Sequence, residues 1–166
     1  MYYGFSARLG RLVLLVATPV FIIAQNANTP SGMAGTWSSS EVRTVQFNDR
    51  ATGAFAKPSG ATITYHITDN GDFQEQTLIQ TSMYNCSDVV FATESGRVHV
   101  DGTKLVFDSI GGRLTSQDNC NARFNYAKQV PANQRVFTQW SIRNGQAGPE
   151  LCMSDDKNHL CYKRNN

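Results

Sequence analysis

Between residues 61 and 108 the sequence alternates apolar and polar side chains in successive short runs. Turn-forming segments at 69–72, 94–96 and 101–102 separate the runs, and another turn is expected at 109–112. Each segment contains a glycine, which adopts positive φ angles without strain. The alternating apolar residues are Ile63, Tyr65, Ile67, Val89, Phe91, Val98, Val100, Leu105 and Phe107. A period of two between glycine-bearing turns predicts an antiparallel meander of strands with one buried face.

The rest of the chain continues this pattern. Further short strands are expected at 38–47, within 113–126, and at 135–143, 151–153 and 160–163. No apolar i, i+3, i+4, i+7 pattern lasts three helical turns, so we expect an all-β protein of about eight to ten short strands in an up-and-down meander. Closure into a β-barrel would remove the exposed edges of such a sheet, and a closed barrel is the predicted architecture. A β-sandwich is the alternative, but it needs longer crossover connections than most of those between residues 61 and 114.

The first 27 residues have the features of an export signal. Arg8 and Arg11 precede an apolar run at 12–24, which contains a proline and is shorter than the roughly 20 residues that span a bilayer. Small residues follow at Ala24 and Ala27, so residues 1–27 are predicted to be a cleaved secretory signal peptide. An uncleaved N-terminal anchor is the alternative. We expect residues 28–34 to form a flexible lead-in and residues 35–166 to form a single domain.

The charge balance excludes one class of partner. Cleavage of the signal removes two of the 15 basic residues, Arg8 and Arg11, and leaves 13 basic against 13 acidic residues. No cluster of more than two Lys or Arg residues follows the signal, so we expect no binding to nucleic acid and no membrane contact beyond the signal segment. The mature protein is predicted to be secreted or periplasmic, and monomeric.

Four cysteines in an exported chain favour disulfide bonds. Of the three possible connectivities, we favour Cys86–Cys120, which would restrict the unfolded chain across the end of the meander, and Cys152–Cys161, which closes a local loop. A four-cysteine metal site is the competing interpretation. It is disfavoured because no C-x-x-C pair exists and the closest two cysteines have eight residues between them.

The sequence contains no recognisable catalytic arrangement. His66, His99 and His159 have no second ligand type at a metal-binding spacing, and there is no Gly-x-Ser-x-Gly segment. The most prominent carboxylates, Asp69, Asp72, Asp101 and Asp108, fall at turns or strand ends, where Asp caps backbone amides. We assign no catalytic residue, metal or cofactor, although a pair of carboxylates could still assemble in three dimensions.

Gly35-Thr36-Trp37, placed ahead of the meander, resembles the G-x-W opening of lipocalins and their calycin relatives. The resemblance implies a barrel in which the tryptophan closes one end beneath an arginine of a late strand, for which Arg143 and Arg164 are both candidates. The second lipocalin motif, Thr-Asp before an aromatic residue in a late loop, is missing. Avidin-like chains share Gly-Thr-Trp, the piece at 52–55 and Thr-Gln-Trp at 138–140, but the polar ring that would hold biotin cannot be traced.

A broader resemblance covers nearly the whole mature chain. Gly-Thr-Trp, Thr-Gly-x-Phe-x-x-Pro-Ser-Gly, Tyr-x-Ile-x-Asp-x-Gly-x-Phe, Tyr-x-Cys, Val-Asp-Gly and Asp-x-Cys occur in this order before a late tryptophan. This series resembles a group of small exported bacterial proteins of unassigned activity. The resemblance implies the fold and export, and it implies no chemistry.

Three functional hypotheses follow. The first is a lipocalin-like barrel that binds a small apolar ligand in its mouth near the loop at 48–60. The aromatic residues expected to line that pocket are Trp37, Tyr65, Phe91, Phe107 and Trp140. The second is a protein- or glycan-binding or inhibitory module that acts through its loops, with the same aromatic residues filling a solid barrel. The third, less favoured, is a hydrolase.

Overall fold

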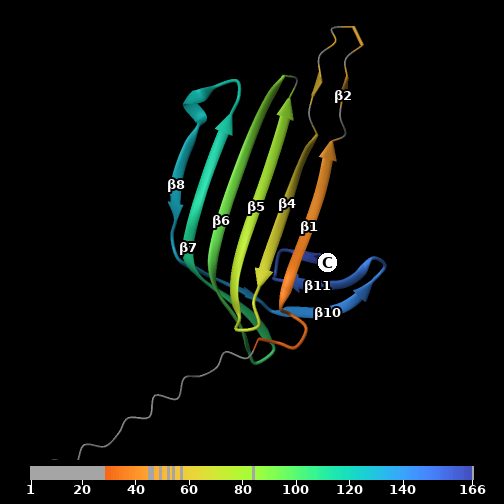
Figure 1. Cartoon of the computed structure of the whole chain (residues 1–166), viewed down its shortest axis with the longest axis vertical. Helices are drawn as coiled ribbons and strands as arrows, with labels where there is room; N and C mark the ends of the chain where they lie inside the picture. The colour runs from red at the N-terminus through yellow and green to blue at the C-terminus, as the bar shows by residue number, and fades with distance from the viewer. Residues whose placement is uncertain are drawn as a thin grey trace, which may run out of the picture.

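The structure is a computed structural model that describes residues 29–44, 47–48, 50–51, 53, 55–56, 58–83 and 85–165. The predicted signal peptide, residues 1–27, lies outside the described residues. The described chain is all-β, as predicted, and its strands form one ten-stranded antiparallel sheet and one two-stranded sheet (Figure 1). No helix among these residues is long and apolar enough to cross a membrane.

The large sheet has the strand order β10-β11-β12-β1-β4-β5-β6-β7-β8, and β9 pairs with β7 beside β8. Its strands are β1 (Gly35–Thr44), β4 (Ser59–Ile67), β5 (Asp72–Met83), β6 (Cys86–Asp101), β7 (Lys104–Asp118), β8 (Tyr126–Val130), β9 (Asn133–Phe137), β10 (Gln139–Gly145), β11 (Gly148–Ser154) and β12 (His159–Asn165). The small sheet pairs β2 (Phe47–Asn48) with β3 (Phe55–Ala56), and a short 3-10 helix, η1 (Ala122–Phe124), precedes β8. The successive pairing of β4, β5, β6 and β7 confirms the predicted meander.

Two predicted turns are instead parts of long strands. Segment 94–96 lies inside β6 and segment 109–112 lies inside β7. The two segments face each other at a β-bulge, where Ser95 pairs with Gly111 and Gly96 with Ser109, so that Ile110 is the extra residue. A Cβ atom at Gly96 would collide with the backbone of Asp108. These glycines therefore permit a close approach of two strands rather than a reversal of the chain.

The prediction of a closed barrel is wrong, because the large sheet is open between β10 and β8. The strand lengths explain why the sheet does not close. Strands β6 and β7 contain 16 and 15 residues, whereas β10, β11 and β12 contain seven each. The short strands lie across the base of the long ones in Figure 1 and reach only their lower part.

The hydrophobic core fills this lower part. Its buried members are Met33, Trp37, Tyr65, Ile67, Phe73, Val98, Leu105, Phe107, Leu151, Met153 and Tyr162. The ring of Phe107 packs against those of Tyr65 and Phe73, with centroids 5.4 and 5.0 Å apart. Burial of these large aromatic and aliphatic side chains is the main stabilising contribution available to the fold.

The Gly-Thr-Trp segment is explained by contacts at the base of this core. The Trp37 indole is fully buried, and its Nε1 donates to the backbone oxygen of Met33 at 2.7 Å. Of the two candidate arginines, Arg164 lies over the Trp37 ring, 5.2 Å from its centroid. Gly35 has a φ of 138°, and a Cβ at this position would lie 2.9 Å from Nε of Arg164. Glycine therefore leaves room for the arginine that covers the tryptophan.

The predicted flexible lead-in, residues 28–34, is not free of the fold where the structure describes it. The Met33 side chain is completely buried in the core, and the Met33 amide donates to the backbone oxygen of Pro30 at 3.0 Å. The polar composition of the segment gave no sign of this contact. A single apolar residue placed against Trp37 is enough to hold this segment at the base of the sheet.

Candidate functional site

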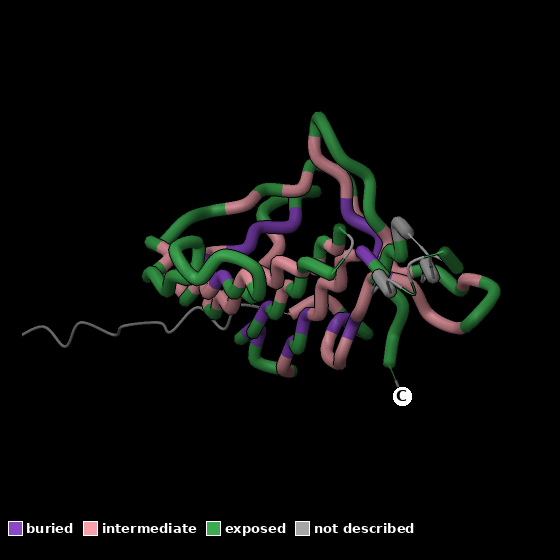
Figure 2. Tube along the Cα trace, turned by 90° about the horizontal axis from the view of Figure 1, so that it is seen from above, coloured by how far each residue is buried: buried purple, intermediate pink, exposed green. Residues whose placement is uncertain are grey.

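Above the bulge, the long strands continue past the core as an uncovered sheet. We call this part the upper half, and it comprises residues 38–42, 59–64, 74–83, 86–95, 111–118 and 126–130. None of its described apolar side chains is buried, whereas the lower half contains the whole core. Seen from above, the strands form a curved wall in which intermediate and exposed residues predominate (Figure 2). A sheet with neither face covered gains little from hydrophobic burial, so its extent requires another explanation.

The two faces of the upper half differ in charge. Side chains alternate between faces along a strand, and the register therefore assigns each residue to the core side or to the opposite side. The acidic residues of the upper half, all on the core side, are Glu41, Glu75, Asp88, Glu94 and Asp118. Within the described strands of the upper half, the opposite side has no acidic residue.

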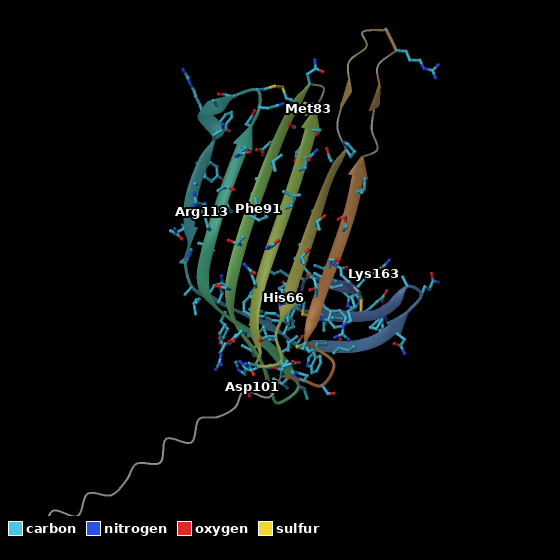
Figure 3. The ribbon with its side chains drawn as sticks, in the orientation of Figure 1. His66, Met83, Phe91, Asp101, Arg113 and Lys163 are labelled. Atoms are coloured by element: carbon cyan, nitrogen blue, oxygen red, sulfur yellow. A yellow bond between two sulfur atoms is a disulfide. The ribbon has the colours of Figure 1, made fainter. Side chains whose placement is uncertain are left out.

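We call two rows of this opposite side the outer platform. The first row pairs Ser38, Thr64, Gln76, Thr93, Arg113 and Gln129 across six strands. The second row pairs Ser40, Thr62, Leu78, Phe91, Thr115 and Ala127 across the same strands. Hydroxyl or amide side chains make up five of the six residues in the first row and three of the six in the second. These groups can each donate and accept hydrogen bonds. In Figure 3, Phe91 and Arg113 lie between Met83, near the top of the sheet, and Asp101, near its base.

Phe91 and Leu78 form the apolar centre of the outer platform. They face each other across β5 and β6, and they are 39% and 42% exposed. Gln76 and Thr93 lie next to them in the first row, and Thr115 follows Phe91 in the second. An exposed ring surrounded by hydroxyl and amide groups can stack against a flat apolar surface while its neighbours form hydrogen bonds to polar groups around that surface.

A groove of about 660 Å³ extends the platform toward the Cys86–Cys120 end of the sheet. Its lining includes Arg113, Thr115 and Gln117 of β7 and Ala127 of β8. Arg113 makes no ion pair with any carboxylate of the described chain. Asp118 also lines the groove, but its Oδ1 already accepts from the backbone amides of Cys120 and Asn121, at 2.7 and 2.8 Å. Arg113 is therefore the side chain most available to a bound molecule at this end.

An ionic cluster lies on the core side of the sheet, just above the core. Arg135 of β9 forms an ion pair with Glu75, donates to the Tyr65 hydroxyl at 3.2 Å, and lies 3.8 Å from an oxygen of Glu94. Glu75 also accepts from Thr77 at 3.1 Å. Because these carboxylates are already satisfied by neighbouring donors, the cluster ties β9 to β5 and β6 where the sheet is open, and it offers no free acid–base pair.

Burial changes the ionisation of this cluster. Burial, together with the nearby negative charge of Glu75, raises the pKa of Tyr65 well above its ordinary value. Burial likewise raises the pKa of Tyr162. Burial alone would lower the pKa of the Arg135 guanidinium, but its interactions with Tyr65, Glu75 and Glu94 outweigh this effect and raise it. At neutral pH the arginine is thus charged and both phenols are protonated.

Four of the five aromatic residues predicted to line a ligand pocket come together in or against the packed core, and only Phe91 lies elsewhere. Trp37, Tyr65 and Phe107 are 0%, 2% and 0% exposed in the core, so no solvent-sized void touches Trp37 or Phe107 and almost none touches Tyr65. Trp140 packs against the same core, and Phe91 lies on the outer platform. The loop at 48–60, expected at the pocket mouth, lies partly outside the described residues.

Both predicted disulfides are confirmed: Cys86 is bonded to Cys120, and Cys152 to Cys161. Such bonds form and persist in oxidising compartments. Cys152, His159 and Cys161 are also grouped closely enough to hold a metal ion. The two sulfurs are bonded to each other, however, so they are not thiolate ligands in this state.

Sequence reasoning did not identify the outer platform. The signal lay in the residues between the apolar positions of the meander, such as Thr62, Thr64, Gln74 and Gln76. Thr is favoured in strands and Lys and Glu are less so, but charged residues still occur at solvent-facing strand positions. The lack of charge at these positions could therefore be seen in the sequence. That it extends over six strands could be seen only from the strand register.

No protein-family model, curated protein or solved structure matches this chain.

Proposed function

We propose that this protein is an exported binding module whose outer platform holds a neutral, hydroxyl-rich polymer, a polysaccharide strand. The observation that carries the proposal is the pair of acid-free rows with an exposed phenylalanine at their centre. Sugar hydroxyls both donate and accept hydrogen bonds, as do Ser, Thr and Gln side chains. The apolar face of a sugar ring can pack on Phe91, and a neutral chain needs no compensating charge.

This proposal develops the hypothesis of a glycan-binding module with a solid interior, and it moves the contact from the loops to a sheet face. The filled core gives no support to the alternative of a small apolar ligand held among Trp37, Tyr65 and Phe107. The hydrolase hypothesis gains no support from the carboxylates of the ionic cluster, because Arg135 holds them. Export through residues 1–27 is part of the proposal, and the two disulfides are consistent with it.

Affinity electrophoresis tests the proposal. The mature chain is run through gels that contain dextran, a soluble β-glucan or, as an anionic comparison, polygalacturonate. We expect retardation by at least one neutral polymer and about tenfold weaker retardation of Phe91→Ala, because removal of the ring removes its stacking. Thr93→Val, which keeps the shape and removes a hydroxyl, is expected to weaken binding by a smaller factor, about threefold.

The matched control is Phe124→Ala, which removes an equally large ring that is 61% exposed but lies in η1. This variant is expected to bind like the wild type. Equal retardation of Phe91→Ala and the wild type would show that the outer platform is not the binding surface. Retardation by polygalacturonate alone would contradict binding of a neutral polymer there.

A further inference from the structure

The Cys152–Cys161 disulfide lies on the solvent-facing side of β11 and β12, away from the core. The two cysteines are directly opposite each other in the ladder, and their Cα atoms are 4.0 Å apart. Cys152 is only 3% exposed, whereas Cys161 is partly exposed. An incoming molecule therefore reaches this bond through the sulfur of Cys161.

Two basic side chains surround that sulfur. The Nη2 of Arg143, from β10, donates to Sγ of Cys161 at 3.5 Å, and Nε2 of His159 lies 3.6 Å from the same atom. The other ring nitrogen of His159 is hydrogen-bonded to the Ser154 hydroxyl at 2.5 Å, which holds the imidazole in place. A nitrogen of His159 also lies within 4.8 Å of both sulfurs. The strands β10, β11 and β12 thus bring an arginine and a histidine to one disulfide.

The Cys86–Cys120 bond has no such surroundings. Both of its cysteines are exposed, and no basic side chain in the described part of the chain contacts either sulfur. Its neighbourhood is made of polar groups such as Asn119, whose Oδ1 accepts from the Ser87 amide at 2.6 Å. If exposure alone decided reactivity, Cys86–Cys120 would be the more easily reduced bond. The charges near Cys161 favour the opposite order.

We propose that Cys152–Cys161 is a thiol-reactive disulfide that oxidises thiols, with Cys161 as the sulfur that exchanges. The thiolate of a small-molecule or peptide thiol attacks Sγ of Cys161 and forms a mixed disulfide. The Cys152–Cys161 bond breaks, its electron pair passes to the sulfur of Cys152, and that sulfur takes a proton from the solvent. A second thiolate attacks the substrate sulfur of the mixed disulfide and releases Cys161 as a thiolate. Two thiols become one disulfide, and the protein gains two electrons.

Arg143 and His159 favour this reaction by stabilising its product. A cation beside a thiolate lowers its energy relative to the thiol, and stabilisation of the reduced form makes the disulfide a stronger oxidant. Glu150 opposes part of this effect, because one of its oxygens lies 3.4 Å from Nε of Arg143. The proposal is independent of polysaccharide binding, since these groups lie in the lower half, away from the outer platform.

Redox titration of the folded full chain tests the proposal. The chain is equilibrated in buffers of glutathione and its disulfide, the thiols are trapped by alkylation, and each cysteine is quantified by peptide mass spectrometry. We expect Cys152–Cys161 to be half reduced at a value of [GSH]²/[GSSG] about tenfold lower than that for Cys86–Cys120. Brief exposure to glutathione should give an adduct on Cys161 and not on Cys152. A short cysteine-containing peptide, used in a parallel arm, shows which source of thiol reacts faster.

Charge variants separate this account from simple accessibility. Arg143→Gln and His159→Gln are each expected to require about three- to tenfold more reducing buffer for half reduction of Cys152–Cys161. Glu150→Gln should shift the midpoint the opposite way, and Lys157→Gln, a cation in the same hairpin turn, should leave it unchanged. Circular dichroism checks that each variant folds. Equal midpoints for the two disulfides would overturn the proposal. It would also be overturned if Arg143→Gln and Lys157→Gln both had the midpoint of the wild type.

Discussion

The lower and upper halves of the large sheet share the same long strands but differ in what covers them. Below the bulge at Ile110, strands β9 to β12 lie against the sheet and enclose Trp37, Tyr65 and Phe107. Above the bulge, β5, β6 and β7 continue as a wall without a described buried apolar side chain. The difference indicates that the lower half stabilises the fold, and that the upper half is an exposed surface positioned by the lower half.

The two halves are also held together by different means. Packing stabilises the lower half, whereas the upper half depends on backbone hydrogen bonds and on Cys86–Cys120, which ties the start of β6 to the segment after β7. Proteins commonly place binding residues on a rigid scaffold whose core lies elsewhere.

Loss of a core aromatic residue should unfold the whole domain more easily. Phe107→Ala is expected to lower the free energy of unfolding by about 3–5 kcal/mol, because it leaves a cavity in the packed core. Ile79→Ala, on the core side of the upper half and 42% exposed, should cost less than about 1 kcal/mol. Urea denaturation followed by fluorescence measures both. Similar costs for the two variants would contradict the contrast between the halves.

Loss of the Cys86–Cys120 disulfide should affect the upper half selectively. The bond joins residues 34 positions apart, and a loop of that length corresponds to as much as about 4 kcal/mol in the chain-entropy estimate. In Cys86→Ser/Cys120→Ser we expect faster amide exchange in β8 and in the upper parts of β6 and β7, with β11 and β12 unchanged. Uniformly faster exchange throughout the chain would show that the halves unfold as one unit.

Arg135 should matter most where the sheet is open. Arg135→Met keeps a long apolar side chain but leaves Glu75 without its ion-pair partner, and it should lower the free energy of unfolding by about 2 kcal/mol. Arg113→Met, a matched change on the outer platform, should have an effect within about 0.5 kcal/mol. Chemical denaturation of the two variants provides the comparison, and equal effects would argue against Arg135 as a tie between β9 and β5.

Alkaline pH should weaken the lower half through Tyr65. Its pKa is raised in the folded state above the ordinary value of 10.0, so the folded protein holds the phenolic proton more tightly than the unfolded chain. The stabilisation is present below pH 10 and is lost as the pH rises above it, by about 1 kcal/mol at pH 10.5 for one such group. Denaturation midpoints between pH 8 and 10.5 measure the loss. The loss of stability should be smaller in Tyr65→Phe. An equal loss in this variant would show that groups other than Tyr65 cause it.

The sequence predicted the parts of this contrast that depend on local pattern. The alternation around Ile63, Tyr65 and Ile67 identified the buried face of β4, and the cysteine spacing led to the correct pairings. Glycine was misleading at Gly96 and Gly112, because the same residue permits both a tight turn and a close approach of strands. Distinguishing these uses requires the partner strand.

Features that depend on several strands at once could not be predicted. The sheet does not close into a barrel because the short strands β10 to β12 lie against much longer ones. The sequence does not predict this, because it defines strand lengths poorly. The choice of Arg164 over Arg143 follows from the pairing of Trp37 with Arg164 between β1 and β12. The outer platform likewise exists only through the register that aligns Gln76, Thr93 and Arg113.

Hydrogen–deuterium exchange of the intact chain, with and without the neutral glucan that retards it, shows which half of the sheet binds. If the upper half is the binding surface, protection should increase at residues 74–80, 89–95 and 111–117 and stay the same at 148–165. Phe91→Ala should lose that protection under the same conditions. Unchanged exchange in the upper half, or new protection confined to β10, β11 and β12, would contradict the account.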